Sequence, residues 1–467
     1  MKAFDNISTV YFLGIGGIGM SALARYFKHM KCIVAGYDRT PTELTRELES
    51  EGIEVHYHDK GAAVAQQLDQ PENTLVVWTP AIPGDHQELN WIRDHGYELW
   101  KRSRVLGFIC ENYPTLAVAG THGKTTVSTM VTSILKATPA GCGAILGGVS
   151  RNFGTNLLLP DNRNQWMVTE ADEYDRSFLQ LKPDIAIITA MDADHLDIYG
   201  EVDAMQEAFV QFARKTRSNG KLLVHERVAH QLRDKLPEGV SMLTYALEPG
   251  SDFYATGLTL DENSRCYRFR LMTPAGETPE IEMAYPGIVN VENGVAAGAA
   301  SWLAGAALEA IKAGLEGYLG VRRRFDIRFK GLKTIYIDDY AHHPEELRAF
   351  IGSVKLLYPG RRITGIFQPH LFTRTRDFID EFARSLELCD QIALLPIYPA
   401  RELPIPGITS ELLFGKIRSK QKQMLEKSDI ANYITAQQPE VLLTMGAGDI
   451  DTYVQPITMM LADAEKN

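Results

Sequence analysis

The sequence has little of what marks secreted, membrane or zinc-scaffold proteins. Its 467 residues contain only 5 cysteines, which are far apart and form no C-x-x-C pair. This odd number and wide spacing argue against a disulfide framework or a zinc site and favour reduced thiols. No apolar stretch approaches the roughly 18 residues that cross a bilayer, and the N-terminus has no signal-peptide pattern. We therefore expect a cytoplasmic protein that does not enter a membrane.

Long basic blocks, low-complexity tracts and repeats of fixed period are also absent. The formal net charge is −11, so nucleic acid is not an expected partner. Anionic ligands stay possible, because a local site can be basic on an acidic protein. The composition, with 45% hydrophobic and 23% charged residues, is that of an ordinary globular protein. At about 150 residues per domain, the length predicts about three domains.

What the sequence does contain is a strand–loop–helix pattern that starts three times. We predict an α/β fold of three domains, each with a mainly parallel sheet. The first is Rossmann-like, the second resembles a P-loop ATPase domain, and the third is again Rossmann-like. The second also holds a more β-rich stretch at 221–289 and an alanine-rich helix at 293–314. The expected domains cover residues 1–111, 112–320 and 321–467.

The first glycine-rich loop fits the dinucleotide-binding pattern G-x-G-x-x-G. Its glycines are Gly14, Gly16 and Gly19, between an apolar strand and a helix, and a second apolar run ends in Asp38. Such a loop cradles a diphosphate at a helix N-terminus, and the acidic residue can bond a ribose or a base. The pattern alone is a weak signal for NAD, because a nucleotide sugar offers the same groups.

A second loop, GTHGKTT at residues 120–126, follows the strand pattern LAVA and precedes a helix. It is a shortened phosphate loop, because the first glycine of G-x-x-x-x-G-K-[ST] would fall on Val118. Lys124 would meet the β- and γ-phosphates of ATP, and the Thr125 hydroxyl would bind Mg²⁺. The plain alternative is a glycine turn with a surface lysine. The strand before and the helix after favour phosphate binding.

Two acidic clusters follow the next predicted strands and could complete a metal site. Carboxylates at the carboxyl ends of neighbouring parallel strands meet at one sheet edge, and Mg²⁺ prefers oxygen ligands. A histidine there is less typical of Mg²⁺ and could be structural. The clusters contain Glu170, Asp172 and Glu173, and then Asp192, Asp194, His195 and Asp197.

Two phosphate-binding loops indicate two phosphorylated ligands on two domains. A hydride-transferring enzyme rarely needs a separate ATP domain, so the first loop is expected to hold something other than NAD. A nicotinamide-dependent oxidoreductase remains an alternative that leaves GTHGKTT unexplained. A non-catalytic nucleotide sensor is another, although it would not need the motifs of the third segment.

These motifs, in this order, resemble the Mur ligase family over essentially the whole chain. The motifs are GIGGIGMS, GTHGKTT, EADEYD, DADHLDIYG, NVEN, RRRF, DDYAHHPEE, QPHLFTRT and MGAGDI. GIGGIGMS and DDYAHHP together are most similar to the members that join L-alanine to UDP-N-acetylmuramate through an acyl phosphate, in peptidoglycan precursor synthesis. A recycling ligase that adds a tripeptide to the same sugar nucleotide is the nearest alternative. The resemblance implies ATP as a substrate, Mg²⁺ or Mn²⁺ as the metal, and a monomer or weak homodimer.

The resemblance also implies roles for residues of the first two domains. Asn290 and Asn293 are expected to contact adenine, although one of them could instead only cap a helix. Lys124 and His195 are implied to be catalytic. The UDP portion would be contacted by Gly16, Gly17, Gly19, Met20, Ser21 and Asp38. ATP would be bound by Gly120, Thr121, His122, Gly123, Lys124, Thr125, Thr126, Asn290 and Asn293, and the metal by Thr125, Glu170 and His195.

In the third domain the resemblance implies three groups. Arg324 would lie near the γ-phosphate of ATP when this domain closes. Asp339 and His342 would face the reaction centre, where a base helps the alanine ammonium lose its proton; the choice between His342 and His343 stays open. His370 and Arg374 would bind the amino acid, since arginine pairs with carboxylates through two parallel hydrogen bonds.

The sequence departs from the family pattern at three points. Leu371 stands where some members carry a second arginine, so carboxylate binding would depend more on Arg374. Val289 stands where a histidine is common, which weakens the adenine assignment of Asn290. The lysine that some sister ligases carbamylate has no clear counterpart, so carbamylation is not expected.

Overall fold

The computed structural model describes residues 4, 6–192, 199–261, 264–400 and 402–466. Its contacts divide the chain into two compact units. The larger unit covers Met1–Thr259, Arg268–Met283 and Glu292–Leu319, and the smaller covers Leu260–Tyr267, Ala284–Val291 and Gly320–Asn467. Within the described ranges, no helix is long and apolar enough to cross a membrane.

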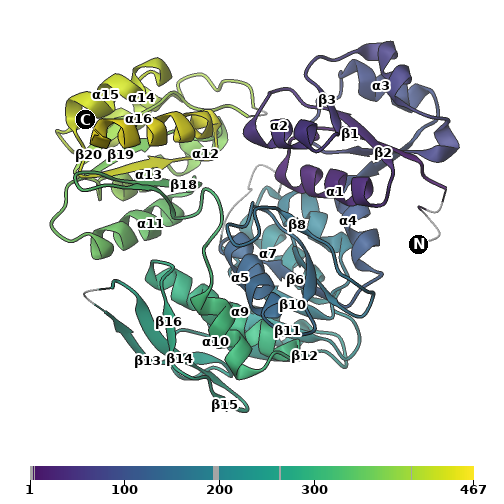
Figure 1. Ribbon diagram of the computed structural model, residues 1–467, viewed down its shortest axis with the longest axis horizontal. Helices are drawn as coiled ribbons and strands as arrows, with labels where there is room; N and C mark the ends of the chain where they lie inside the picture. The colour runs from purple at the N-terminus through teal and green to yellow at the C-terminus, as the bar shows by residue number, and fades with distance from the viewer. Residues whose placement is uncertain (1–3, 5, 193–198, 262–263, 401, 467) are drawn as a thin grey trace. The chain divides into compact units, whose positions relative to one another are not determined.

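The larger unit begins with a five-stranded sheet in the order β3-β2-β1-β4-β5, in which all pairs are parallel (Figure 1). The fully buried β1 lies at its centre, as the apolar run before the glycine loop predicts. Helices α1 and α4 pack on one face, while α3 packs on the other. The strands are β1 Thr9–Leu13, β2 Ile33–Tyr37, β3 Glu54–His56, β4 Thr74–Trp78 and β5 Glu98–Lys101, and the helices are α1 Ile18–His29, α2 Glu43–Ser50, α3 Gln87–Asp94 and α4 Arg102–Cys110.

A seven-stranded sheet follows in the order β12-β11-β10-β6-β9-β7-β8. Only β7 and β8 pair antiparallel. Strand β6, which leads into the phosphate loop, lies between β10 and β9, which lead into the two acidic clusters. The strands are β6 Thr115–Ala119, β7 Cys142–Ile145, β8 Leu157–Leu158, β9 Trp166–Glu170, β10 Ile185–Ile188, β11 Lys221–His225 and β12 Ser241–Tyr245. The helices are α5 Lys124–Lys136, α7 Val202–Ala213 and α8 Glu226–Leu232.

The predicted β-rich stretch and alanine-rich helix differ in detail from the structure. A small separate sheet accounts for only part of 221–289, and the rest belongs to the seven-stranded sheet and to α8. The single helix predicted at 293–314 is wrong: α9 ends at Leu303, and α10 begins after a turn at Gly305, whose φ of +97° suits glycine. The elements are β13 Tyr254–Leu260, β14 Tyr267–Thr273, β15 Gly276–Glu277, β16 Ile281–Met283, α9 Ile288–Leu303 and α10 Leu308–Glu316.

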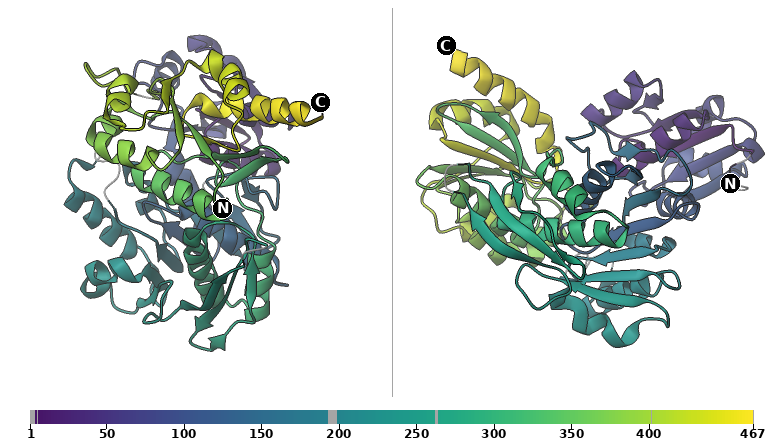
Figure 2. Two further views of the ribbon diagram at one scale, coloured as in Figure 1. Left: turned by 90° about the vertical axis from the view of Figure 1, so that its left-hand side faces the viewer. Right: turned by 60° about the horizontal axis from the view of Figure 1, so that its bottom comes forward.

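The smaller unit holds a six-stranded sheet in the order β17-β18-β22-β19-β20-β21. Strand β17 is antiparallel to β18 and the other pairs are parallel. This confirms the prediction of a third mainly parallel sheet. The strands are β17 Asp326–Lys330, β18 Ile335–Asp339, β19 Ile363–Phe367, β20 Gln391–Leu394, β21 Lys422–Met424 and β22 Val441–Met445. The helices are α11 Pro344–Leu357, α12 Phe372–Asp377, α13 Ile379–Leu386, α14 Ser410–Lys416, α15 Ile430–Gln437 and α16 Val454–Lys466. These segments have the green-to-yellow colours in Figure 2.

Candidate functional site

The glycine loop between β1 and α1 is held by backbone bonds and by Asp38. The N–H groups of Gly14 and Ile15 donate to the Tyr37 carbonyl at 2.8 and 3.0 Å. The Gly16 N–H donates to the Asp38 carboxylate at 2.7 Å, and a Cβ on residue 16 would lie only 2.8 Å from that oxygen. Burial raises the pKa of Asp38 although backbone N–H groups partly offset the rise. Asp38 therefore shapes the loop itself, and its contact with a ribose stays a prediction.

Two residues predicted to contact the UDP portion have buried side chains. Met20 belongs to α1, and its side chain packs into the core. The Ser21 hydroxyl donates to the Ile18 carbonyl at 2.9 Å and accepts from the Asn156 amide at 3.0 Å. Asn156 is fully buried, donates also to the Ile18 carbonyl at 2.7 Å, and accepts from Arg25 at 2.6 Å. Asn156, which no sequence pattern marked, thus ties the start of α1 to the loop before β8.

The phosphate loop has the backbone that its glycines predict. Gly120 and Gly123 have φ angles of +133° and +81°, and Gly123 is the N-cap of α5. A Cβ on residue 120 would lie 2.0 Å from the Thr189 hydroxyl oxygen, so the loop packs directly against the end of β10. The Thr121 hydroxyl accepts from the Asp192 N–H at 3.2 Å. The first-turn N–H groups of α5 can therefore meet an anion, as in other phosphate loops.

Lys124, the first residue of α5, forms an ion pair inside the loop. Its Nζ donates to the Gly120 carbonyl at 2.6 Å and to the Glu173 carboxylate at 2.7 Å. Burial alone would lower the pKa of Lys124, but the nearby charges of Glu173 and Asp172 raise it, so the ammonium is charged. The Tyr199 hydroxyl donates to the Glu173 carbonyl at 2.6 Å and so holds the ion-pair partner of Lys124 in position. Glu173 therefore has a defined position that the sequence could not assign.

Oxygen atoms suited to Mg²⁺ lie beside the start of α5. Glu170 is the last residue of β9, and its carboxylate accepts from the Gly147 N–H at 2.8 Å and from the Ser128 hydroxyl at 3.4 Å. Ser128 lies one helical turn after Thr125, the other oxygen ligand predicted from the sequence. These hard oxygen donors fit Mg²⁺. The third predicted ligand, His195, is outside the described residues, as are Asp194 and Asp197.

The two asparagines predicted to read adenine have different surroundings. The Asn293 side-chain oxygen lies 2.8 Å from where a Cβ on Gly123 would be, so this asparagine covers the phosphate loop. The Asn290 amide is buried and donates to the Pro286 carbonyl at 2.5 Å within its own turn. Between them in sequence, Glu292 accepts from His225 Nε2 at 2.9 Å, because His225 Nδ1 already accepts from the Arg227 N–H. Neither asparagine is the N-cap of α9, which begins at Ile288, so the structure does not bear out the capping alternative.

In the smaller unit, Asp339 ends β18 and is buried. Its two carboxylate oxygens accept from the N–H groups of Phe325 and Ala341 at 2.6 and 2.7 Å. Burial raises the pKa of Asp339 to about 7, although Arg324 and these backbone groups act to lower it. A carboxyl group with such a pKa can exchange a proton near neutral pH.

The two neighbouring histidines have different positions. His343 is the N-cap of α11: its Nδ1 accepts from the Glu345 N–H at 3.4 Å, and Pro344 follows at the first helical position. His342 lies outside the helix, with Nδ1 at 3.0 Å from the Tyr340 carbonyl and 3.3 Å from a Glu346 oxygen. The cap explains His343 structurally and favours His342 for a chemical role.

The arginines before β17 are also distinguished. Arg323 donates to the Asp338 carboxylate at 3.2 Å and to the Gly446 carbonyl at 2.6 Å. Arg324 lies 3.7 Å from a Glu346 oxygen and 5.0 Å from the centre of the Tyr340 ring. Arg323 therefore links β18 to the turn after β22, which leaves Arg324 as the better candidate for ligand binding.

The segment that carries His370 and Arg374 is fastened to a second loop. The Leu371 N–H donates to the Tyr398 carbonyl at 3.0 Å, and the His370 and Tyr398 rings stack with centroids 5.8 Å apart. The Glu402 carboxylate accepts from the Thr373 N–H at 3.0 Å, and also from the Thr373 hydroxyl. Arg374 is 6% exposed. The two predicted amino-acid-binding residues thus lie just before and within α12, next to the loop that carries Tyr398 and Glu402.

An acidic and histidine cluster lies in the first sheet domain, apart from the predicted sites. Asp59, His86 and Glu88 lie close enough to hold a metal ion. Asp59 already accepts from three backbone N–H groups, and Glu88 accepts from the Tyr11 hydroxyl and the Lys60 N–H, both at 2.7 Å. These bonds use the carboxylate oxygens, so we interpret the cluster as structural.

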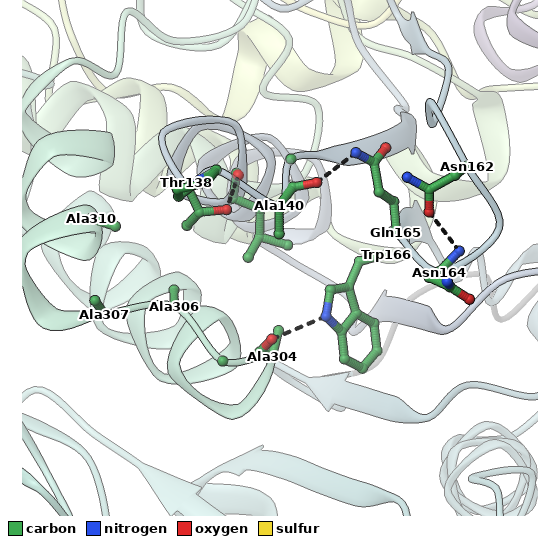
Figure 3. Close-up of a pocket in the computed structure, with 14 residues that line it drawn as sticks. Thr138, Ala140, Asn162, Asn164, Gln165, Trp166, Ala304, Ala306, Ala307 and Ala310 are labelled. Atoms are coloured by element: carbon green, nitrogen blue, oxygen red, sulfur yellow. Dashed lines mark hydrogen bonds between the residues drawn. The ribbon is translucent and has the colours of Figure 1, made fainter.

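A hollow of about 640 Å³ opens at the other end of α5 from Lys124 (Figure 3). Its wall includes the Trp166 indole, which donates to the Ala304 carbonyl at 3.0 Å, and Gln165, which donates to the Ala140 carbonyl at 2.5 Å. It lies at the amino ends of β7 and β9, and none of the predicted site residues lines it. This hollow is therefore not the nucleotide site.

Comparison with known protein families matches three consecutive domains. Residues 9–114 match "Mur ligase family, catalytic domain", residues 118–301 match "Mur ligase middle domain", and residues 323–448 match "Mur ligase, glutamate ligase domain".

Similar curated proteins cover the same full length. The UDP-N-acetylmuramate–L-alanine ligase of Parabacteroides distasonis is 47% identical over 98% of both chains. That of Phocaeicola vulgatus is 46% identical over 98% of this chain and 99% of its own. Among solved structures, the UDP-N-acetylmuramate-alanine ligase MurC from Thermotoga maritima has a TM-score of 0.82 at 25% identity, covering 98% of this chain and 99% of its own.

Proposed function

The chain belongs to the Mur ligase family, and from that premise we propose that it joins L-alanine to the muramyl carboxylate of UDP-N-acetylmuramate with cleavage of ATP. The observation that carries this function is the identity to L-alanine ligases along nearly the whole chain. Such similarity spans both phosphate-binding loops and the segment expected to hold the amino acid. The product is a precursor of peptidoglycan, and we place the reaction in the cytoplasm.

The chemistry requires activation of a poor acylating group. A muramyl carboxylate oxygen attacks the γ-phosphorus of ATP, and ADP leaves. The amine of L-alanine then attacks the carbonyl carbon of the resulting acyl phosphate. The tetrahedral intermediate expels inorganic phosphate, the nitrogen loses a proton, and an amide remains. Positioning and charge stabilisation provide most of the rate enhancement in phosphoryl transfer of this kind.

The larger unit would hold the two phosphorylated substrates. Backbone N–H groups after Gly16 would meet the UDP diphosphate, and those after Gly123 would meet the phosphates of ATP. Lys124 would exchange its contact with Glu173 for the β- and γ-phosphates, because both partners are anionic. The fixed Glu173 keeps the lysine side chain in place until ATP arrives.

Thr125 and Glu170 would hold Mg²⁺, with His195 proposed as a further ligand. The ion would neutralise negative charge on the phosphate oxygens. Glu170 is oriented for this by the Gly147 N–H, which bonds the carboxylate without adding a competing cation. A side chain at residue 147 would displace it, since a Cβ there would lie 2.3 Å from the other Glu170 oxygen.

The smaller unit would supply one group for phosphoryl transfer and the groups for the attack by the amine. We assign charge neutralisation on the transferred phosphoryl group to Arg324 and acceptance of the amine proton to His342, with Asp339 as a buried carboxyl group nearby in sequence. Arg374 would bind the alanine carboxylate, and His370, just before the same helix α12, would also contact the amino acid. The three-part division at residues 1–111, 112–320 and 321–467 remains our proposal for which segment binds which substrate.

The test is phosphate release from ATP and Mg²⁺ with UDP-N-acetylmuramate, in parallel reactions with L-alanine, glycine, L-serine and the tripeptide. We expect the fastest release with L-alanine and a product heavier by one alanine residue in mass spectrometry. Release with the tripeptide alone would assign the chain to the recycling reaction. No release with any acceptor, together with stabilisation by NAD, would contradict a ligase.

A further inference from the structure

Arg102, the first residue of α4, lies against the glycine loop. A Cβ on Gly19 would be 2.7 Å from Nη1 of Arg102, 3.2 Å from its Cδ and 3.4 Å from its Cζ. The guanidinium group therefore covers the first turn of α1 at the third glycine of the loop pattern. In dinucleotide-binding folds this glycine serves close helix–strand packing. Here its missing side chain makes room for a cation.

The other end of the same guanidinium group reaches an acidic loop. Its Nη2 donates to the Asp172 carboxylate at 2.9 Å, and the two side chains are 23% and 38% exposed. Asp172 follows β9 and also accepts from the Tyr174 N–H at 3.1 Å. Arg102 thus spans the space between the glycine loop and the loop that carries Glu173, and both α1 and α4 lie in one part of Figure 1.

The position is electrostatically unfavourable without a further anion. A helix N-terminus carries a partial positive charge, so a cation beside it is repelled. The N-cap of α1 is a glycine, and the first turn has no acidic residue. One carboxylate, itself partly exposed, offsets the arginine only in part. A diphosphate would neutralise both the guanidinium group and the helix terminus.

We infer that Arg102 binds the diphosphate of the UDP-sugar, together with the first-turn N–H groups of α1. This inference rests on the proposed function and adds a ligand contact that the glycine loop alone does not supply. Arginine suits the task because its planar fork donates two parallel hydrogen bonds to phosphate oxygens.

The test measures binding of UDP and of uridine, without ATP or metal, by calorimetry. Arg102→Gln should weaken UDP binding at least about tenfold, the usual effect of losing a charge-assisted hydrogen bond. Uridine binding should not change, because uridine has no phosphate. Arg102→Lys should lie between the two, since it keeps the charge and loses the fork.

Two variants separate ligand binding from a structural effect. Arg104 lies two residues further along the same helix, 54% exposed and stacked on Trp100 at 3.8 Å, so Arg104→Gln should bind UDP like the native chain. Asp172→Asn breaks the ion pair and keeps the arginine, so it should bind UDP at least as tightly as the native chain.

Three outcomes would overturn the inference. Equal weakening of UDP and uridine by Arg102→Gln would show a general structural effect. Weakening of UDP by Asp172→Asn to the level of Arg102→Gln would assign the effect to the ion pair. Unchanged UDP binding in Arg102→Gln would remove Arg102 from the site while leaving the proposed function intact, whereas a native chain that binds no UDP would contradict the proposed function itself.

Discussion

Replacing Lys124 separates its structural role from its role at ATP. In Lys124→Met the side chain keeps its length but no longer pairs with Glu173, whose carboxylate is only 1% exposed. Removing one partner of a buried ion pair costs about 3–5 kcal/mol, and the lost bond to the Gly120 carbonyl adds about 1 kcal/mol. Because the Lys124 side chain is 17% exposed, the lower end applies. We expect the free energy of unfolding to fall by about 4 kcal/mol.

Adding Glu173→Gln removes the buried unpaired charge. The double variant should therefore recover about 2 kcal/mol of that loss, because replacing both members of a buried pair is far less costly than replacing one. Turnover should not recover, since no cation at residue 124 would meet the β- and γ-phosphates. Binding of the UDP-sugar should stay within about twofold of the native chain, as expected for distant sites.

The assay is a double-mutant cycle in urea without nucleotide, on the native chain, both single variants and the double variant. Turnover is measured on the same preparations. An interaction energy below about 0.5 kcal/mol would refute the argument that this contact stabilises the loop. Turnover by the double variant would refute the role of Lys124 at the phosphates.

Three further predictions concern the other groups of the site. Arg374→Ala should raise the KM for L-alanine at least about tenfold and leave the KM for ATP unchanged, because it removes a bidentate carboxylate partner; steady-state kinetics with each substrate varied would show the opposite split if the role is wrong. Excess EDTA should stop ATP cleavage and added Mg²⁺ should restore it, whereas activity in EDTA would exclude the metal site. The raised pKa of Asp339, about 7 against an ordinary 3.8, means that its contribution to stability is full below pH 4 and is lost as the pH rises towards 7. Between pH 5 and 8 the Asp339→Asn variant should therefore lose less stability than the native chain, as measured by thermal unfolding. Parallel curves of stability against pH for the two proteins would contradict the raised pKa of Asp339.

Much of the fold was predictable because its signals are local. The buried run before Gly14 and the run before Gly120 are each short, apolar and followed by a glycine turn, which together predict a strand leading into a helix. The order of strands within each sheet was not predictable, because it depends on which strands pair across long stretches of chain. The break between α9 and α10 was missed because the alanine-rich composition continues across Gly305, and the turn is marked by one glycine alone.

The candidate site shows the same division. The phosphate loop, its lysine and the acidic clusters could be named from spacing, because helix N-termini and strand ends impose fixed residue types. The partner of Lys124 could not, since Glu173 is one of three acids in a short loop and only the fold decides which one faces the ammonium. His342 and His343 were equivalent in sequence, and the cap of α11 distinguishes them.

By itself, the sequence determined the family, the three mainly parallel sheets and the two glycine-rich loops between a strand and a helix, because each depends on local backbone requirements and residue order. Tertiary structure decided which polar groups are already bonded to one another: Asp38 to the glycine loop, Ser21 to Asn156, and Arg323 to Asp338. It also placed Arg102 against Gly19, which is far earlier in the chain. Such pairings join residues distant in sequence, and no local pattern records them, because only burial and strand order bring those side chains together.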